Sequence, residues 1–430
     1  MRANFQTFAM GTTKYVKFDF FMKAVLFTIF SLVMFCTITA QSITQIDLTK
    51  AKFGQIPASI IFEEIKYVPL ETHPDGLLNI KVATYYLTDK YIIAMNFLGG
   101  AYLFDRETGK FIREVSSFGP GPDEYRGPLY NRYGFDEKNN ILFATDAGPY
   151  SKVWKCINIE SNKVESTIHK PLGDNNNVGF DKEAPWLLSV QAPWLLKEKI
   201  YISFCNNRSG KDKIRLVVFD KEGTVIKAYP NYLEYKDPNR NRIPASCGIF
   251  YYFDEHTYFK EVCYNDTVFR VDENSMSPHI IFNLGNKQPS YYHQQDAEFN
   301  KGKYLITFVS ESSSFIVFNF SYYTETVKFS GLGETITDSK NNTLYTGYYD
   351  KKSKQAFISS TPDYKQSGFS AIGLPVSFHP VSINKNKEMI TCIDPAELMK
   401  NKDRIEMKYR HLLQDMQEDD NPIVVIAKLK

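Results

Sequence analysis

The residue types that carry most enzyme chemistry form no recognisable local motif in this sequence. The seven histidines show no His-Glu-x-x-His or comparable ligand spacing. Residues 174–179 resemble the start of a calcium loop, but Val178 replaces an oxygen ligand and Pro185 replaces the bidentate Glu. Residues 368–373 are one residue too long for a nucleophile elbow. These patterns predict no catalytic residue, no metal ligand and no cofactor.

A glycine- and proline-containing loop, residues 118–125, offers the first candidate for binding. Its small or ring-locked residues would present the side chains that follow them to a ligand on a rim of the fold, and those side chains are Asp123, Glu124, Tyr125 and Arg126. The same composition also fits a tight crossing between structural units that Glu124 caps. Both interpretations remain open.

Two tryptophans are the second candidate. Trp186 and Trp194 lie in a local duplication, Ala-Pro-Trp-Leu-Leu, with eight residues between corresponding positions. An exposed Trp stacks on sugar rings or contacts a peptide, whereas a half-buried pair covers the edge of a core.

Composition excludes several classes of protein. The 430 residues include 51 Lys and Arg against 49 Asp and Glu, so the chain has no charge excess to attract phosphate backbones, and nucleic acid is not an expected partner. Hydrophobic residues at 43% provide for a core. Aromatic residues reach 15%, which favours β-sheet.

A repeated hairpin is the structural unit that would position the candidate binding residues. A β-rich run, a polar turn and a second β-rich run recur, with the turn-side positions Asp105, Glu160, Asp220, Asp272 and Phe320 separated by 55, 60, 52 and 48 residues. Periods near 50 residues indicate a propeller or another repeat array. The pairs of runs are 101–105 with 111–115, 154–159 with 163–168, 216–220 with 224–229, 267–271 with 279–282, and 315–320 with 325–329.

The longer final interval predicts one more blade with an insertion. Asp394, Pro395 and Glu397 are typical of a helix start, and an apolar stripe predicts a helical insertion at about 395–418. An early strand at 60–70 is expected to pair with the C-terminal blade and close the ring. The expected fold is all-β: a six-bladed β-propeller of four-stranded antiparallel blades.

Several stretches resemble an exported bacterial six-bladed propeller family that is related to NHL-repeat proteins and mostly lacks assigned activity. The resemblance covers residues 55–430. The family loop usually reads Arg-x-Gly-x-Gly-Pro-Gly-Glu-Tyr, whereas here Ser116 and Ser117 come first and Asp123 replaces a Gly, which weakens an anion-binding role. The resembling stretches are 68–72, 103–105 with 109–110, 118–125, 265–270 and 420–425.

The N-terminus predicts export. Lys23, an apolar run at 24–35 and a short stretch that ends in the small residue Ala40 outline a signal peptide, with Met22 as the expected start. The apolar run is too short for a membrane span. The expected domains are this segment at 1–40, a linker at 41–58 and the propeller at 59–430. We expect a periplasmic or extracellular protein without a stable transmembrane anchor, and Cys36 after Phe35 makes a lipoprotein the alternative.

These observations favour a non-catalytic, monomeric binding propeller that recognises a protein, peptide or glycan through a rim or the central channel. The alternative is a metal-dependent enzyme of lactonase or lyase type, with Ca²⁺ held at the propeller axis by residues from several blades. A structural role in an envelope assembly is a third hypothesis. The sequence leaves open the pairing of Cys156, Cys205, Cys247, Cys263 and Cys392.

Overall fold

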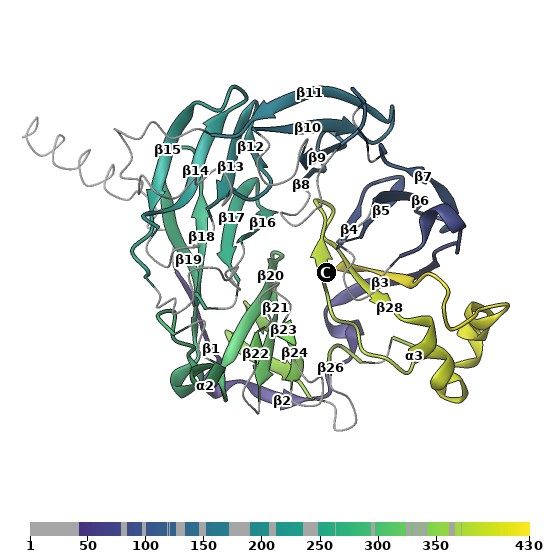
Figure 1. Cartoon of the computed structure of the whole chain (residues 1–430). Helices are drawn as coiled ribbons and strands as arrows, with labels where there is room; N and C mark the ends of the chain where they lie inside the picture. Colours follow the sequence, from purple (N-terminus) through teal and green to yellow (C-terminus); the bar gives the residue numbers. More distant parts are fainter. Residues whose placement is uncertain are drawn as a thin grey trace, which may run out of the picture. The chain divides into compact units, whose positions relative to one another are not determined.

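Antiparallel sheets arranged in a ring make up the chain from Thr44 to Lys430 (Figure 1). The computed structural model describes residues 43–78, 84–96, 100–117, 119, 121–125, 134–145, 152–171, 190–205, 212–234, 248–262, 264–293, 297–323, 328–329, 335–336, 342–360, 366–370 and 372–430. Met1–Ile43 form a separate unit, and the expected signal peptide within it lies outside the described residues.

Six blades form the ring, each with four antiparallel strands that succeed one another from the axis outward. The first three blades contain β4 (Thr84–Leu87), β5 (Tyr91–Met95), β6 (Ala101–Asp105) and β7 (Phe111–Glu114); β8 (Gly134–Asp136), β9 (Ile141–Thr145), β10 (Val153–Asn158) and β11 (Lys163–His169); and β12 (Trp194–Lys197), β13 (Ile200–Phe204), β14 (Ile214–Asp220) and β15 (Val225–Pro230). The last three contain β16 (Gly248–Phe253), β17 (His256–Glu261), β18 (Thr267–Val271) and β19 (Met276–Asn283); β20 (Tyr304–Glu311), β21 (Phe315–Tyr323), β24 (Asn342–Asp350) and β25 (Gln355–Ser359); and β27 (Ser382–Ile383), β28 (Glu388–Ile393), β29 (Ile423–Leu429) and β3 (Phe62–Pro69).

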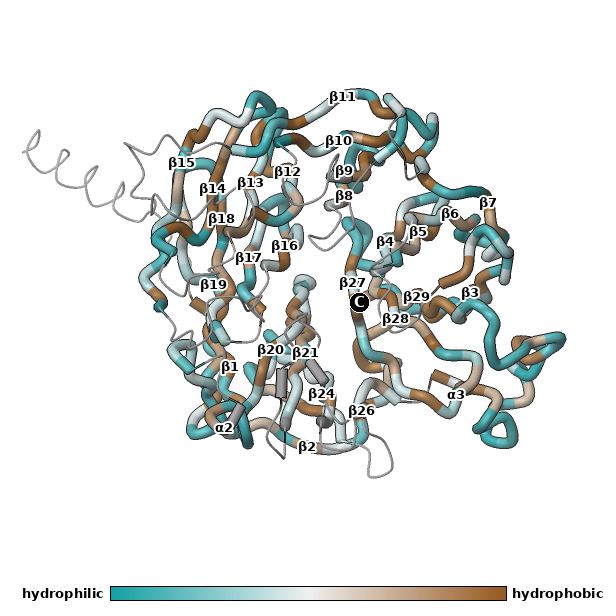
Figure 2. Tube along the Cα trace, viewed as in Figure 1, coloured by the Kyte–Doolittle hydropathy of each residue, from teal (hydrophilic) through white to brown (hydrophobic). Residues whose placement is uncertain are grey.

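The hydrophobic core lies between neighbouring blades. Middle strands such as β5, β14 and β29 are almost continuously buried, because both faces of each sheet are covered by the adjacent sheets. Outer strands such as β7 and β15 are partly exposed. Figure 2 shows the same distribution, with hydrophobic residues concentrated along the middle strands.

Aspartate stabilises most of the outer hairpin turns, and Asn158 takes this place in the second blade. In the β6–β7 turn, Asp105 Oδ1 accepts hydrogen bonds from the backbone N–H groups of Glu107 and Thr108, and Gly109 has φ +71°. A Cβ atom at Gly109 would lie 1.9 Å from the Pro69 carbonyl oxygen, so this turn requires glycine. The equivalent turn of the fourth blade uses Asp272, which accepts from Asn274 N and Ser275 N.

The fifth predicted hairpin was wrong, although the six-bladed fold is confirmed. Phe315–Tyr323 (β21) is the second strand of its blade and pairs with β20 and β24, not with residues 325–329. The outer hairpin of this blade is β24–β25, where Asp350 Oδ1 accepts from Lys352 N and Ser353 N. The prediction placed this hairpin one strand too early because it took Phe320 as the turn position, whereas the turns of the first, third and fourth blades contain an aspartate. Three short strands accompany this blade: β22 (Lys328–Phe329), β23 (Thr335–Ile336) and β26 (Gln366–Ser367).

Pairing of β3 with β29 closes the ring, as predicted. The two strands are antiparallel, with Val68 opposite Val424. Asn421, just before β29, reinforces the junction: its Nδ2 donates to the carbonyl oxygens of Glu71 and Gly76, each at 2.8 Å, and its Oδ1 accepts from Leu78 N at 2.9 Å. The asparagine is 4% exposed, so its hydrogen bonds are shielded from water.

The segment expected as a linker forms two strands at the outside of the ring. β1 (Thr44–Asp47) pairs in parallel with β19, and β2 (Lys52–Gly54) pairs in parallel with β25. Ile46 and Leu48 are buried against the fourth blade. The segment therefore covers the outer edges of the fourth and fifth blades before it enters the sixth as β3.

The C-terminal insertion contains α3 (Pro395–Lys400) and two short 3₁₀ segments, Lys402–Arg404 and Met407–Leu413. Asp394 caps α3 by accepting a hydrogen bond from Ala396 N, as its sequence indicates. Asn401 Nδ2 donates to the Glu397 carbonyl oxygen where α3 ends. Elsewhere α2 (Ala297–Asn300) is a single turn. Among the described residues, no helix has the length and apolar character needed to cross a membrane.

Candidate functional site

A cavity of about 440 Å³ lies at the axis of the ring, within the size range of pockets that bind small molecules. The innermost strand of every blade contributes to its wall, so the site depends on closure of the ring. The described residues that line it are Thr84, Tyr85, Tyr86, Met95, Asn96, Gly134, Phe135, Glu137, Gln191, Ala192, Pro193, Trp194, Gly248, Ile249, Phe250, Tyr251, Phe308, Val309, Val381, Ser382 and Ile383.

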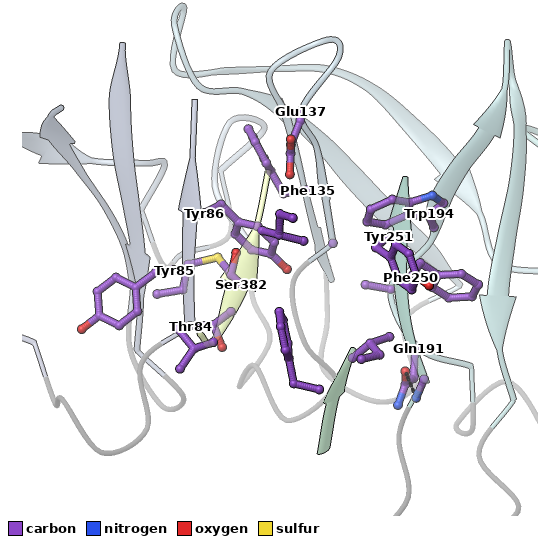
Figure 3. A pocket seen from close by; sticks show the side chains of 18 of the residues that line it. Thr84, Tyr85, Tyr86, Phe135, Glu137, Gln191, Trp194, Phe250, Tyr251 and Ser382 are labelled. Atoms are coloured by element: carbon purple, nitrogen blue, oxygen red, sulfur yellow. Dashed lines mark hydrogen bonds between the residues drawn. The ribbon is translucent and has the colours of Figure 1, made fainter. Parts of the chain in front are cut away.

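Aromatic rings form two opposed parts of this wall. Tyr86 on β4 lies against Phe135 on β8, with ring centroids 5.3 Å apart. Trp194 on β12 stacks on Phe250 at 5.9 Å and contacts Tyr252 at 4.7 Å, both on β16. Figure 3 shows Tyr86 and Phe135 on one side of the cavity and Trp194 and Phe250 on another. Flat apolar faces on two sides suit a ligand with a ring or a compact apolar body.

The wall of the cavity has few polar side chains. Gln191 accepts a hydrogen bond from Gly248 N at 3.1 Å, and Asn96 Nδ2 donates to the Leu77 carbonyl oxygen at 2.9 Å, so both amides also support the wall itself. Trp194 Nε1 is buried, and the described part of the chain supplies no hydrogen-bond acceptor for it. A buried donor of this kind costs free energy unless a ligand or water accepts from it.

Glu137 is the one charged side chain among the described lining residues. It lies in the turn that follows β8, and Figure 3 shows its carboxylate at the end of the cavity near Phe135. Its Oε2 accepts a hydrogen bond from Lys385 N at 2.7 Å. Burial raises the pKa of Glu137 to about 7; the Lys385 backbone N–H and ammonium oppose the rise, and the charges of Asp136 and Asp89 add to it.

Turns from three blades meet around Glu137. Asp89 belongs to the first blade, Glu137 to the second and Lys385 to the sixth. Lys385 Nζ lies 3.7 Å from Asp89 Oδ2, and Asn386 Nδ2 donates to Asp89 Oδ1 at 2.8 Å. The Lys385 ammonium is therefore shared with Asp89, while its backbone N–H contacts Glu137.

The predicted loop residues lie elsewhere and mostly contact their own loop. Glu124 Oε2 accepts from Gly121 N at 2.6 Å, and Asp123 Oδ1 accepts from Val164 N at 3.0 Å. Tyr125 is 1% exposed and packs in the core between the first two blades. Lys155 Nζ donates to the carbonyl oxygens of Gly121, Pro122 and Glu124. None of these side chains lines the axial cavity.

Among the other predicted binding residues, Trp194 is the one that the structure describes, and it lies in the axial wall. Arg126 and Trp186 lie outside the described residues, as does the rejected calcium loop at 174–179. Sequence reasoning missed Glu137, Tyr86 and Phe135. The turn Asp136-Glu137-Lys138 has the composition of an ordinary solvent-exposed turn, and nothing in its sequence shows that it meets turns of two other blades.

His, Cys and acidic side chains outside the axial cavity are the remaining candidates for chemistry in the described part of the chain. No group of three or more His, Cys, Asp or Glu residues there could hold a metal ion. His279 is buried and contacts Glu311 at 2.7 Å, and Lys351 approaches the same carboxylate at 2.6 Å, between the fourth and fifth blades. Cys156, Cys205 and Cys392 have free thiols; burial raises the pKa of the Cys205 and Cys392 thiols to about 12. Cys247 and Cys263 lie outside the described residues.

Two solved structures share the fold. A "Putative exported protein" from Bacteroides fragilis has a TM-score of 0.61 at 16% identity, over 90% of this chain and 100% of that chain. A member of the DUF4221 family from Bacteroides vulgatus has a TM-score of 0.52 at 9% identity, over 86% of this chain and 97% of that one. At these identities the likeness concerns the fold alone. No curated protein matches the sequence.

The family assignment rests on sequence. The model of a domain of unknown function, DUF4934, matches residues 43–428, which include all six blades and the two outer strands β1 and β2. The match leaves the expected relation to NHL-repeat proteins unconfirmed. The chain belongs to the DUF4934 family.

Proposed function

We propose that this protein is an exported, non-catalytic binding propeller that takes a small organic molecule, or one unit of a peptide or glycan, into its axial cavity. The observation that carries the proposal is the cavity itself: six inner strands enclose about 440 Å³ between aromatic walls with few polar groups. Binding sites for small ligands commonly combine apolar walls with a few placed polar groups.

The contrast with the glycine loop supports this choice of site. The loop carboxylates accept hydrogen bonds from backbone N–H groups, whereas Trp194 Nε1 in the axial wall has no acceptor among the described residues. A ligand that reaches Trp194 would gain both a stacking surface and this hydrogen bond.

Thermal unfolding in the presence of a library of short peptides, mono- and disaccharides, small amines and small alcohols tests the proposal. A ligand at 100 times its Kd stabilises the folded state by about 2.7 kcal/mol, which is readily measured. We expect Trp194→Ala to weaken binding of any hit about 10- to 100-fold, because it removes a central aromatic contact.

Trp154→Phe is the matched control. Trp154 is 1% exposed, stacks on Phe219 between the second and third blades and does not line the cavity. Its replacement should lower stability and leave affinity unchanged. Hits that bind Trp194→Ala as tightly as the wild type would place the site elsewhere.

Export is a separate part of the proposal. Its support is the signal segment before Ala40 and the name of the Bacteroides fragilis structure that shares the fold. Production of the full chain in a Gram-negative host, followed by fractionation and N-terminal sequencing, tests it. We expect periplasmic or secreted protein that begins at Gln41; intact protein confined to the cytoplasm would contradict export.

A further inference from the structure

We propose that the ligand of the axial cavity carries an ammonium group on an apolar body, with the ammonium paired to Glu137 and the body between the aromatic walls. This inference rests on the proposed function and specifies the chemical class of the ligand. It starts from the composition of the wall: Glu137 is the one charged group among the described lining residues, and every other named residue there is apolar, aromatic or neutral polar.

The contacts of Glu137 leave room for a cationic partner. Among the described residues, the hydrogen-bond donor to its carboxylate is Lys385 N. A carboxylate accepts about four hydrogen bonds. The Lys385 ammonium, 3.7 Å from Asp89 Oδ2, is shared with that second carboxylate. An ammonium on the ligand would supply both the missing donors and the missing positive charge.

The charges around Glu137 exclude an anionic ligand. Asp136 on β8 and Asp89 in the β4–β5 turn are negative, Lys385 in the β27–β28 turn is positive, and Tyr252 on β16 is neutral. With Glu137 ionised, this set carries a net negative charge. An anionic group would be repelled, and a neutral group would leave the carboxylate poorly solvated.

The aromatic walls favour the same ligand. A cation near the face of Tyr, Phe or Trp is attracted by the ring quadrupole, and an alkyl or aryl body packs on the same surfaces. Tyr86 and Phe135 lie next to the Glu137 end of the cavity in Figure 3, so the cation and the start of the apolar body would both contact them.

Proton linkage follows from this pairing. Burial holds the pKa of Glu137 at about 7, so the carboxyl of the unliganded protein is mostly protonated at pH 6 and mostly ionised at pH 8. An ammonium binds the ionised form. Its affinity should therefore rise about tenfold from pH 6 to pH 8, with release of protons below pH 7.

A matched pair of probes tests the inference: 2-phenylethylammonium and 2-phenylethanol, which differ mainly in charge. Isothermal titration calorimetry at pH 6 and pH 8 should show about tenfold tighter binding of the amine at pH 8. Binding of the alcohol should not tighten between pH 6 and pH 8. The capped dipeptide acetyl-Phe-Lys-amide, as a third probe, shows whether a lysine side chain or a free amine is the better source of the ammonium.

Glu137→Gln should abolish the preference for the amine and its pH dependence while it leaves alcohol binding intact, which also shows that the variant is folded. Glu198→Gln is the control, because Glu198 directly follows β12 as Glu137 follows β8 but is exposed and does not line the cavity. Glu198→Gln should bind both probes as the wild type does.

The outcomes separate this inference from the proposed function. Equal affinity for amine and alcohol, unchanged by Glu137→Gln but weakened by Trp194→Ala, would overturn the ammonium while the axial site stands. Failure of all three probes to bind at millimolar concentration would overturn the ammonium inference. Continued binding of other library hits through Trp194 would then preserve the proposed function.

Discussion

Glu124 and Glu137 both lie in segments that connect strands, but their carboxylates have different surroundings. Glu124 accepts hydrogen bonds from Gly121 N and Ser117 Oγ within its own loop. Glu137 receives a backbone N–H from another blade and lies at the end of the axial cavity. A carboxylate that accepts hydrogen bonds within its own loop stabilises that loop, whereas a desolvated carboxylate at a cavity lowers stability.

The largest expected effect concerns the loop. Lys155→Met removes a nearly buried ammonium that donates to three loop carbonyl oxygens, so it should lower the free energy of unfolding by about 2–4 kcal/mol. Denaturant titration measures this loss. Ligand affinity at the axial cavity should not change. A loss below about 0.5 kcal/mol would show that the loop does not depend on this contact.

The next largest effect is a gain of stability from Glu137→Gln, and it depends on pH. Because the pKa of Glu137 is about 7 in the folded protein and near 4.5 in the unfolded chain, the folded state favours the protonated carboxyl. The penalty is absent below pH 4.5, grows as pH rises and is complete above pH 7. Glu137→Gln should therefore stabilise the protein by about 2 kcal/mol at pH 8, after allowance for partial exposure, and have little effect at pH 4.5.

Denaturant titration of the wild type and Glu137→Gln at both pH values checks this prediction. Equal stability of the two proteins at pH 8 would mean that solvent reaches the carboxylate freely. The comparison with Glu124 would then lose its basis.

A smaller effect is expected for Gly121→Val. A Cβ atom at this position would lie 2.9 Å from Glu124 Oε2, so the carboxylate must shift and its bond to Gly121 N weakens. We expect a loss of about 1–2 kcal/mol and faster proteolysis between the first two blades. An unchanged melting temperature and unchanged protease resistance would contradict the place of this loop in blade packing.

The smallest effect belongs to Glu198→Gln, the counterpart of Glu137 in the third blade. Glu198 is exposed, so its replacement should change the free energy of unfolding by less than about 0.5 kcal/mol at any pH from 5 to 8. Thermal unfolding across this range measures it. A stabilisation as large as that of Glu137→Gln would show that position in the turn, not the cavity, sets the effect.

Much of the fold could be predicted from particular residues. Asp105, Asp220 and Asp272 identify outer hairpins because an aspartate that bonds the turn backbone is a local feature. Asp350 carries the same signal, but the sequence analysis did not use it. The fifth hairpin was therefore predicted too early in the chain. The strands at Thr44–Asp47 and Lys52–Gly54 are too short, and pair with partners too distant, for periodicity to reveal them.

The site was harder to predict because a propeller assembles its axis from distant residues. Trp194 could be selected by residue type alone. Glu137 could not: its pKa depends on burial at a junction with Asp89 and Lys385, which lie in other blades. No spacing rule connects these three positions, and only the closed ring brings them together.

Our proposals depend most on the desolvation of the Glu137 carboxyl at the axial cavity, where we propose that it pairs with a cationic ligand. The most direct measurement is ¹³C NMR of the glutamate carboxyl carbons across a pH titration, with the Glu137 resonance assigned by its loss in Glu137→Gln. We predict a midpoint near pH 7 in the free protein and a clear fall when 2-phenylethylammonium, but not 2-phenylethanol, is added. A midpoint below pH 5 in the free protein would show that the Glu137 carboxyl is not desolvated.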